Sequence, residues 1–211
     1  MTAFAGGAPF SAMDKSTLRR EMRAQRQALS FHEARKAAQR LLRLALRHRL
    51  LRAQRIGFYL PMGEEIDLLP LLNVALWRNK ASYLPVIPPR GARRLWFSRI
   101  GERDTWYQNR FGIFEHTALE RRRAPQLDLL FVPLVAFDAQ GHRLGMGGGY
   151  YDTSLAHLRT RRLFRKPKLI GVAYDFQRVE ALPSEPWDVA LDAVLTDRAL
   201  YQFRKKLLMA S

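Results

Sequence analysis

The first part of the chain follows the spacing of amphipathic helices. Apolar residues recur near helical spacing at Leu18, Met22 and Leu29. Ser30 begins a second stretch, with Glu33 three residues later in the pattern of a capping box. The apolar stripe of this second stretch consists of Ala34, Ala37, Ala38, Leu41, Leu42, Ala45 and Leu46. We therefore expect two amphipathic helices before residue 55.

From residue 55 onward the period changes, and short β-prone runs alternate with helical stretches. The run at 127–132 is almost continuously apolar, which is typical of a strand buried on both faces. The other expected strands cover residues 56–60, 81–87, 95–100, 169–174 and 193–195, and the expected helices cover 67–77 and 150–159. This alternation predicts an α/β fold with a mostly parallel twisted sheet flanked by helices.

The length of 211 residues suits a single domain, which we expect over residues 14–211 with a basic helical segment at its N-terminus. Residues 1–13 are small, Gly-rich and uncharged, and we expect a disordered leader there. The absence of cysteine excludes disulfides, thiolate catalysis, iron–sulfur clusters and Cys-based zinc sites. No apolar run reaches the ~20 residues of a membrane helix, and no secretory signal is evident. We therefore expect a cytoplasmic protein with no membrane partner.

The charge of the chain narrows the partners. Thirty-six Lys and Arg stand against 19 Asp and Glu, which leaves a net charge of +17. Thirteen of these basic residues, but only three acidic ones, lie between residues 14 and 55. Such a balance favours nucleic acid, or small molecules that carry phosphate or carboxylate groups. A solvated basic face on two helices is the alternative for most of these side chains.

The strongest chemical signal is the glycine-rich segment at residues 141–152, between an expected strand and an expected helix. Ligands of parallel sheets bind beyond the carboxyl ends of the strands, where such connections lie. Four glycines at positions 145, 147, 148 and 149 remove Cβ atoms, and their N–H groups form a concavity suited to phosphate oxygens. Arg143 adds a charged donor, and Asp152 an oxygen ligand for magnesium. A flexible connection is the alternative.

Two further segments carry carboxylates near expected strand ends. Glu65 follows a Pro-Gly turn, where one carboxylate can recognise a heterocycle with N–H donors; favourable acidic charge at a helix start is its alternative. Asp67 is better explained as a helix N-cap. Asp192 stands beside the short strand at 193–195, where a second magnesium ligand can project; a structural role is its alternative. The segment at 110–115 is by itself no more than a turn.

These segments occur together, in one order, in a known family. The sequence from about residue 15 to 195 resembles the 5-formyltetrahydrofolate cyclo-ligase family. The segments that carry the resemblance are Lys15-Ser16-Thr17-Leu18-Arg19, the turn at 60–66, Phe111-Gly112-Ile113-Phe114-Glu115, Arg143 to Asp152, and Asp188 to Leu195. The stretch Gly-Met-Gly-Gly-Gly-Tyr-Tyr-Asp at 145–152 is the most specific. One departure is His116, where the family usually has proline.

The resemblance implies ATP- and Mg²⁺-dependent ring closure of 5-formyltetrahydrofolate to 5,10-methenyltetrahydrofolate. It implies catalytic roles for Arg143 and Tyr151, folate contacts at Leu60 and Glu65, and magnesium ligands at Asp152 and Asp192. The ATP-binding positions that it implies are Lys15, Ser16, Thr17, Leu18, Arg19, Arg143, Leu144, Gly145, Met146, Gly147, Gly148, Gly149, Tyr150 and Tyr151.

The partner that follows is a folate, with or without a polyglutamate tail, bound by a monomer. The main alternative is a nucleic-acid-binding protein, which the basic helices favour. Against it, no recognition motif interleaves aromatic with basic residues, so we expect no specific nucleic-acid partner. A second alternative is a phosphosugar or CoA-type enzyme on a similar sheet. Dependence of the activity on a nucleotide would distinguish a cyclo-ligase from such an enzyme.

Overall fold

The computed structural model describes residues 14–101, 105–109, 112, 114–160, 166–185 and 187–203. The leader expected at residues 1–13 lies outside the described residues.

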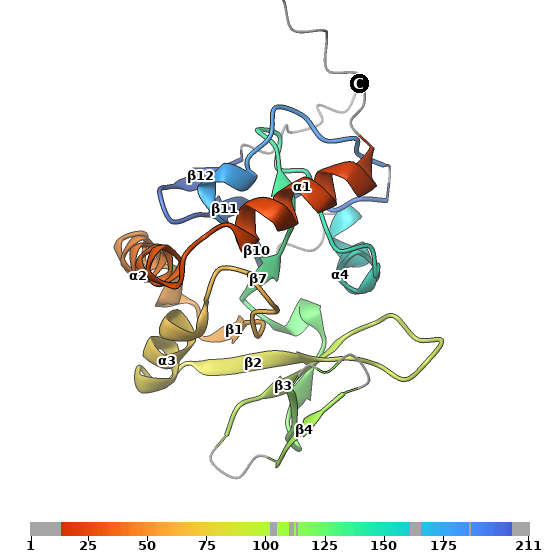
Figure 1. The fold of residues 1–211 in the computed structure, drawn as a ribbon. Coiled ribbons are helices and arrows are strands. Elements are labelled where there is room, and N and C mark those ends of the chain that lie inside the picture. The colour runs from red at the N-terminus through yellow and green to blue at the C-terminus, as the bar shows by residue number, and fades with distance from the viewer. Residues whose placement is uncertain are drawn as a thin grey trace, which may run out of the picture.

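An eight-stranded sheet organises the fold, in the strand order β12-β11-β10-β7-β1-β2-β3-β6 (Figure 1). The four adjacent pairs from β11 to β2 are parallel, and the pairs at the two edges are antiparallel. The mostly parallel sheet predicted from the alternation of strands and helices is therefore confirmed. Its strands are β1 (Arg55–Gly57), β2 (Ala81–Val86), β3 (Trp96–Arg99), β6 (Arg121–Arg122), β7 (Leu129–Pro133), β10 (Lys168–Val172), β11 (Ala193–Leu195) and β12 (Leu200–Gln202).

Helices cover both faces of this sheet. In Figure 1, α2 and α3 lie on one side of the strands, α4 lies on the other, and α1 crosses in front of β7 and β10. The helices are α1 (Lys15–Gln27), α2 (Phe31–Arg47), α3 (Leu69–Trp77) and α4 (Tyr150–Leu155), with 3₁₀ segments η1 (Leu50–Arg52), η2 (Ala124–Gln126), η3 (Ala156–Thr160) and η4 (Asp175–Gln177). The capping box that starts α2 is present, because Glu33 N–H donates to Ser30 Oγ and Ser30 N–H donates to Glu33 Oε2.

Strand β7 explains the continuous apolar run found in the sequence. Leu129 and Phe131 join the core cluster that includes side chains of α2 and α3. Leu130 and Val132 join the second cluster, which contains Leu155 of α4. Because successive side chains of a strand point to opposite faces, a strand covered on both sides needs apolar residues at every position.

Most strand boundaries differ from the expectation by one or two residues, and three elements differ in a more informative way. β1 ends at Gly57 rather than at residue 60: the Phe58 N–H still donates to Tyr83 O, and the chain then leaves the sheet. α3 begins at Leu69 rather than at residue 67, and the Asp67 carboxylate accepts the Leu69 N–H of its first turn. The helix expected over 150–159 divides into α4 and η3.

Two small two-stranded sheets were not predicted from the hydrophobic pattern. β4 (Thr105–Gln108) pairs with β5 (Phe114–Thr117), and β4 is exposed along its whole length. β8 (Ala136–Phe137) pairs with β9 (Arg143–Leu144), which places a hairpin between β7 and α4. The glycine-rich loop therefore follows β9 and not the buried strand β7.

Candidate active site

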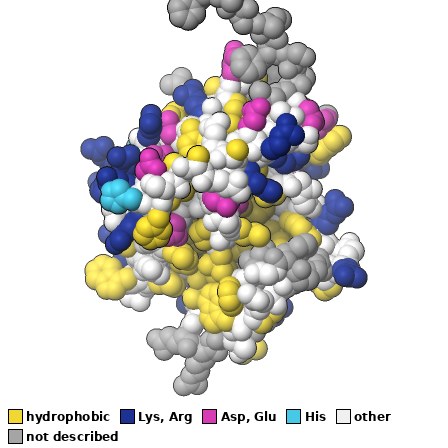
Figure 2. Space-filling model, viewed as in Figure 1, with side chains coloured by type: hydrophobic (Ala, Val, Ile, Leu, Met, Phe, Trp, Pro, Cys, Tyr) yellow, Lys and Arg dark blue, Asp and Glu magenta, His cyan; other side chains and the backbone are white. Residues whose placement is uncertain are grey.

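A cavity of about 560 Å³ opens beyond the carboxyl ends of three parallel strands. Tyr59 and Leu60 follow β1, Ile87 follows β2, Pro133 ends β7, and all four residues line the cavity. This is the edge at which ligands of such sheets bind. Figure 2 shows hydrophobic side chains gathered in a hollow of this face, with Lys and Arg side chains around it.

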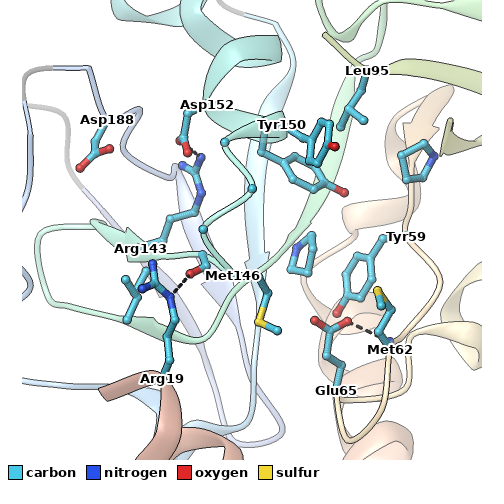
Figure 3. A pocket seen from close by; sticks show the side chains of 18 of the residues that line it. Arg19, Tyr59, Met62, Glu65, Leu95, Arg143, Met146, Tyr150, Asp152 and Asp188 are labelled. Carbon is cyan, nitrogen blue, oxygen red and sulfur yellow. Dashed lines mark hydrogen bonds and ion pairs between the residues drawn. The ribbon is translucent and has the colours of Figure 1, made fainter. Parts of the chain in front are cut away.

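One end of the cavity, called here the glycine-loop end, is built by α1 and residues 145–149. Arg19 Nε donates to the carbonyl of Gly145 at 2.9 Å, which fixes the guanidinium against the loop (Figure 3). Gly147 and Gly149 have φ of +96° and +68°, and side chains are strained in that region of φ. The loop therefore needs glycine at these two positions for its backbone conformation.

Arg143 is an enclosed cation of the glycine-loop end, and its side chain is 6% exposed. Its guanidinium donates to the Asp152 carboxylate and to the carbonyl of Val189. Two acceptors from different segments set the direction of the group. The structure thus brings Arg143 and Asp152 together at the cavity, as the sequence predicted.

Residues 15–19, the first predicted binding segment, lie in the first turns of α1, and only part of them faces the cavity. Lys15 and Arg19 line the cavity, because residues four apart lie on one helix face. Leu18 is buried among apolar side chains of a third core cluster, together with Met22. Ser16 is exposed and donates to Asp14, and neither Ser16 nor Thr17 lines the cavity.

The two predicted magnesium ligands lie at different edges of the sheet. Asp152 lines the cavity. Asp192 immediately precedes β11 and accepts the Leu169 N–H at 2.8 Å at the start of β10, so it lies at the amino ends of the strands. It does not line the cavity. The structure therefore does not bring this pair together.

Asp188 is the acidic residue that sequence reasoning missed. It lines the cavity and is drawn with Asp152 in Figure 3. Its Oδ2 accepts the Glu185 N–H at 2.8 Å, which orients the carboxylate. The rule that ligands bind at carboxyl strand ends was the available signal, because it disfavours an aspartate that directly precedes a strand.

The other end of the cavity, called the Glu65 end, is mostly apolar. Its walls include Tyr59, Leu60, Met62, Leu84, Pro85, Ile87 and Leu95. The partly buried Glu65 accepts the Met62 N–H at 3.1 Å through Oε2 (Figure 3). Desolvation raises the pKa of the Glu65 carboxyl, while the Met62 N–H and the charge of Arg26 oppose the rise. The two predicted contacts Leu60 and Glu65 thus share this end.

Tyr150 and Tyr151 follow the glycine loop and line the cavity. Desolvation, with a further contribution from the Glu65 charge, raises the pKa of the Tyr151 phenol well above its usual range. The phenol therefore stays protonated at neutral pH and can donate a hydrogen bond. The backbone of Gly148 packs closely against Tyr150: a Cβ at this position would lie 3.0 Å from the Tyr150 ring.

Glu115 of β5 links the β4–β5 hairpin to the cavity wall. The carboxylate is buried and accepts the Ile87 N–H at 2.8 Å, the Tyr107 hydroxyl at 2.6 Å and the Asn109 amide at 2.7 Å. The next residue, His116, is buried and stacks on Trp106 with ring centroids 5.0 Å apart. Residues 110, 111 and 113 of the same predicted motif lie outside the described residues.

The described residues contain neither a membrane-spanning helix nor a ready-made metal cluster. No helix among them is long and apolar enough to cross a membrane. No group of three or more His, Asp or Glu side chains that could hold a metal ion was found in that part of the chain. A metal ion here would need oxygen ligands from a bound molecule or from water in addition to protein carboxylates.

Comparisons with known proteins agree with one another. A sequence model of the 5-formyltetrahydrofolate cyclo-ligase family matches residues 11–197. The 5-formyltetrahydrofolate cyclo-ligase of Haemophilus influenzae is 38% identical over 179 residues, covering 83% of this chain and 92% of that protein. The Escherichia coli K12 protein of the same name is 39% identical over 154 residues, covering 72% and 82%.

Two solved structures of methenyltetrahydrofolate synthetases have a similar fold. The NMR structure of Aquifex aeolicus 5,10-methenyltetrahydrofolate synthetase has a TM-score of 0.76 at 31% identity, covering 94% of this chain and 97% of that chain. A 5,10-methenyltetrahydrofolate synthetase from Mycoplasma pneumoniae has a TM-score of 0.68 at 27% identity, covering 88% and 99%.

Proposed function

The chain belongs to the 5-formyltetrahydrofolate cyclo-ligase family, and from this premise we propose that it converts 5-formyltetrahydrofolate to 5,10-methenyltetrahydrofolate at the expense of ATP. The observation that carries the proposal is the division of one cavity into two chemical ends. The glycine-loop end offers Lys15, Arg19 and Arg143 to phosphate oxygens, and the Glu65 end offers an apolar slot with one carboxylate.

The proposed reaction begins with transfer of the terminal phosphoryl group of ATP to the formyl oxygen on N5, which releases ADP. The folate N10 then attacks the activated formyl carbon, its proton is lost, and the C–O bond to phosphate breaks. The products are 5,10-methenyltetrahydrofolate, ADP and inorganic phosphate. Phosphoryl transfer depends on positioning and charge stabilisation more than on a protein nucleophile. Arg143 suits that task because Asp152 and the Val189 carbonyl already orient it.

The geometry supports the roles that we propose for the glycine-loop end. Lys15 and Arg19 line the cavity from one face of α1, and Arg19 already donates to Gly145 O. Preorganised donors stabilise developing charge without reorganising during the reaction. We assign the phosphates of ATP to the space between α1 and the loop, and the protonated Tyr151 to a donor role near the reacting oxygen.

The Glu65 end suits the pterin part of the folate. A planar heterocycle with N–H donors fits between apolar walls, and a carboxylate satisfies those donors when they leave water. Glu65 is the acidic side chain that lines this end. We therefore assign it the recognition of the pterin ring, with Leu60 packing beside it.

The carboxylates fit a magnesium ion bound together with ATP. Asp152 and Asp188 line the cavity, and oxygen ligands from one or two carboxylates plus phosphates and water are the set that Mg²⁺ prefers. Asp192, the ligand first inferred from the family resemblance, lies at the other edge of the sheet. We propose Asp188 in its place. When bound, the ion would neutralise phosphate charge.

The decisive experiment is an absorbance assay of 5,10-methenyltetrahydrofolate formation with purified protein. Full turnover should require 5-formyltetrahydrofolate, ATP and magnesium together, and omission of any one should abolish it. Equal turnover without nucleotide would overturn the proposal. ADP and phosphate should appear in equal amounts with the methenyl product.

We also propose an oligomeric state, a range of folate substrates and a location for the protein, each of which can be tested with the purified chain or in cells. We expect a cytoplasmic monomer that accepts folates with or without a polyglutamate tail and binds no nucleic acid specifically. The net charge of +17 supports salt-sensitive attraction to any polyanion. Light scattering measures the oligomeric state, and binding to RNA that vanishes at physiological salt would agree with this assignment.

A further inference from the structure

Tyr59 carries a hydroxyl that the fold itself does not use. The residue follows β1 and is 4% exposed, and its ring belongs to the core cluster that also contains Ile66 and Leu84. Among the described residues, the Tyr59 hydroxyl has no hydrogen-bond partner. Hydroxyls of buried tyrosines normally have one. Packing of the ring therefore explains the position of Tyr59 but not the presence of its oxygen.

The Tyr59 side chain faces the Glu65 end of the cavity. Tyr59 and Glu65 both line the cavity, and in Figure 3 the Tyr59 hydroxyl points toward the Glu65 carboxylate. Five residues separate the two in the chain, and a turn closes between Met62 and Glu65. In this turn the Met62 N–H donates to Glu65 Oε2 and the Glu65 N–H donates to Met62 O, each at 3.1 Å. A hydroxyl and a carboxylate thus share one end of the cavity.

The Tyr59 hydroxyl is a hydrogen-bond donor at neutral pH. Desolvation, with a further contribution from the Glu65 charge, raises the pKa of the Tyr59 phenol well above its usual range. The Glu65 carboxylate accepts the Met62 N–H, and it forms no hydrogen bond with Tyr59 in the structure. The phenol O–H is therefore available to a bound molecule.

One edge of the pterin ring of a folate carries two donors and an acceptor. The 2-amino group and N3–H are the donors, and the 4-oxo oxygen beside N3 is the acceptor. A carboxylate can accept both N–H groups, but it has no hydrogen to offer the neighbouring oxygen. A carbonyl left without a partner in an apolar slot costs free energy. The apolar side chains at this end of the cavity offer no donor: Met62, Leu84, Pro85, Ile87 and Leu95.

We propose that Tyr59 is a specificity-determining residue for the folate: its hydroxyl donates to the 4-oxo oxygen of the pterin ring, while the Glu65 carboxylate accepts the adjacent N–H groups. This assignment rests on the proposed function of Glu65. Because the Tyr59 ring is packed in the core, the hydroxyl is held before the ligand arrives, and binding costs little side-chain freedom. The pair selects a 2-amino-4-oxo pteridine over a ring that lacks the oxo group, since the hydroxyl would then be left unpaired.

The first arm of the test measures binding of 5-formyltetrahydrofolate to the full chain by calorimetry without ATP. Tyr59→Phe removes one oxygen and keeps the packed ring. The dissociation constant should rise about three- to tenfold, the scale of one neutral hydrogen bond. Tyr174→Phe is the matched control, because Tyr174 is also 4% exposed but does not line the cavity, and it should leave the constant unchanged. Unchanged affinity in Tyr59→Phe would overturn the proposal.

The second arm reads the carbonyl itself. 5-Formyltetrahydrofolate labelled with ¹³C at C4 is bound to the chain, and its signal is followed by NMR. A hydrogen bond to a carbonyl oxygen withdraws electron density from the carbon, so the C4 signal should lie at lower field in the native chain than in Tyr59→Phe. Tyr174→Phe should give the native signal. A loss of affinity in Tyr59→Phe with an unmoved C4 signal would indicate a packing role and would overturn the assignment.

Turnover separates this inference from the proposed reaction. In Tyr59→Phe the Michaelis constant for 5-formyltetrahydrofolate should rise while that for ATP stays unchanged, since Tyr59 lies away from the glycine-loop end. A parallel rise of both constants would indicate a general disturbance and would also overturn the assignment. If the native chain binds 5-formyltetrahydrofolate but forms no methenyl product, the proposed reaction fails, and the C4 signal still decides the role of Tyr59. If the native chain does not bind this folate, both proposals fail.

Discussion

The two ends of the cavity hold their charges in different ways. At the glycine-loop end, Arg19 and Arg143 donate to the backbone carbonyls of Gly145 and Val189, so each guanidinium is held by a neighbouring segment. At the Glu65 end, a lone carboxylate accepts one N–H among apolar side chains. Guanidinium groups stay charged at any ordinary pH, whereas desolvation raises the pKa of the Glu65 carboxyl. The first end should therefore respond to loss of side chains, and the second also to pH.

The largest expected effect is at the glycine-loop end. Arg19→Ala should lower kcat/KM by about 2–4 kcal/mol of transition-state stabilisation, the scale of losing one preorganised donor. Arg20→Ala, an exposed neighbour on α1, should change it by less than about 0.5 kcal/mol. Each variant removes one positive charge. Steady-state kinetics therefore distinguish the specific contacts of Arg19 from the effect of the helix's net charge. Equal losses would show that α1 acts through its net charge alone.

The Glu65 end should show a smaller loss with a pH signature. Glu65→Gln should weaken folate binding by about 1.5–3 kcal/mol, as expected when a hydrogen bond to a charged group is lost. Because desolvation raises the pKa of Glu65, folate affinity of the native chain should fall as pH drops toward that value. The variant should have a flat profile over the same range. Calorimetric titration with folate at several pH values measures both quantities.

Glu65→Gln should also change stability in the direction opposite to its effect on binding. A carboxyl whose pKa is raised by folding binds more protons in the folded state, so stability declines as pH rises through its titration. Replacing it with Gln should therefore raise the unfolding temperature at neutral pH. A lower unfolding temperature would mean that the carboxylate is stabilising where it stands.

The backbone of the glycine loop can be tested apart from its charges. Gly147→Ala should destabilise the fold by about 1–2 kcal/mol, because φ at this position is +96°. Gly145→Ala is the matched control: its φ is not positive, and an added Cβ would meet no atom within 4 Å. Its effect on stability should be within about 0.5 kcal/mol. Urea unfolding compares the two, and equal losses would remove the special role of φ.

The smallest effect is expected at Glu120, which does not line the cavity and whose pKa is shifted in the direction opposite to that of Glu65. Hydrogen bonds from Tyr83, Arg99 and Arg122 lower the pKa of Glu120 to about 2. This stabilisation is present above the usual Glu range and is lost as pH falls through about 2. Because the side chain is 36% exposed, Glu120→Gln should cost less than about 1 kcal/mol at neutral pH. Thermal unfolding at neutral pH checks it, and a gain in stability would contradict it.

The sequence predicted the central elements because their patterns are local. The spacing of Leu18 and Met22, the capping box at Ser30 and the apolar run of β7 each appear within a few residues. Hairpins such as β8–β9 are two residues per strand, too short for a period to show. β4 is exposed at all positions, so its sequence does not show the alternation of apolar and polar residues that marks a half-buried strand.

The site was predictable where one segment carries its own chemistry. The glycine loop, Arg143 and Asp152 are neighbours in sequence, and the structure places them together. The choice between Asp188 and Asp192 needed the sheet, because which edge a residue reaches depends on the pairing of β11 with β10. Tyr59 needed tertiary structure, since a tyrosine among the apolar residues of an expected strand gives no sign that its hydroxyl will face a cavity.

The cavity also has a chemical weakness against oxidants. With no cysteine in the chain, peroxide has thioethers as its main sulfur targets. Met62 and Met146 are both well exposed, and they lie at the Glu65 end and in the glycine loop, respectively. Sulfoxidation would place a polar, chiral group on each wall, reversible by methionine sulfoxide reductases. Oxidative damage should thus impair both substrate ends at once while leaving the buried core intact.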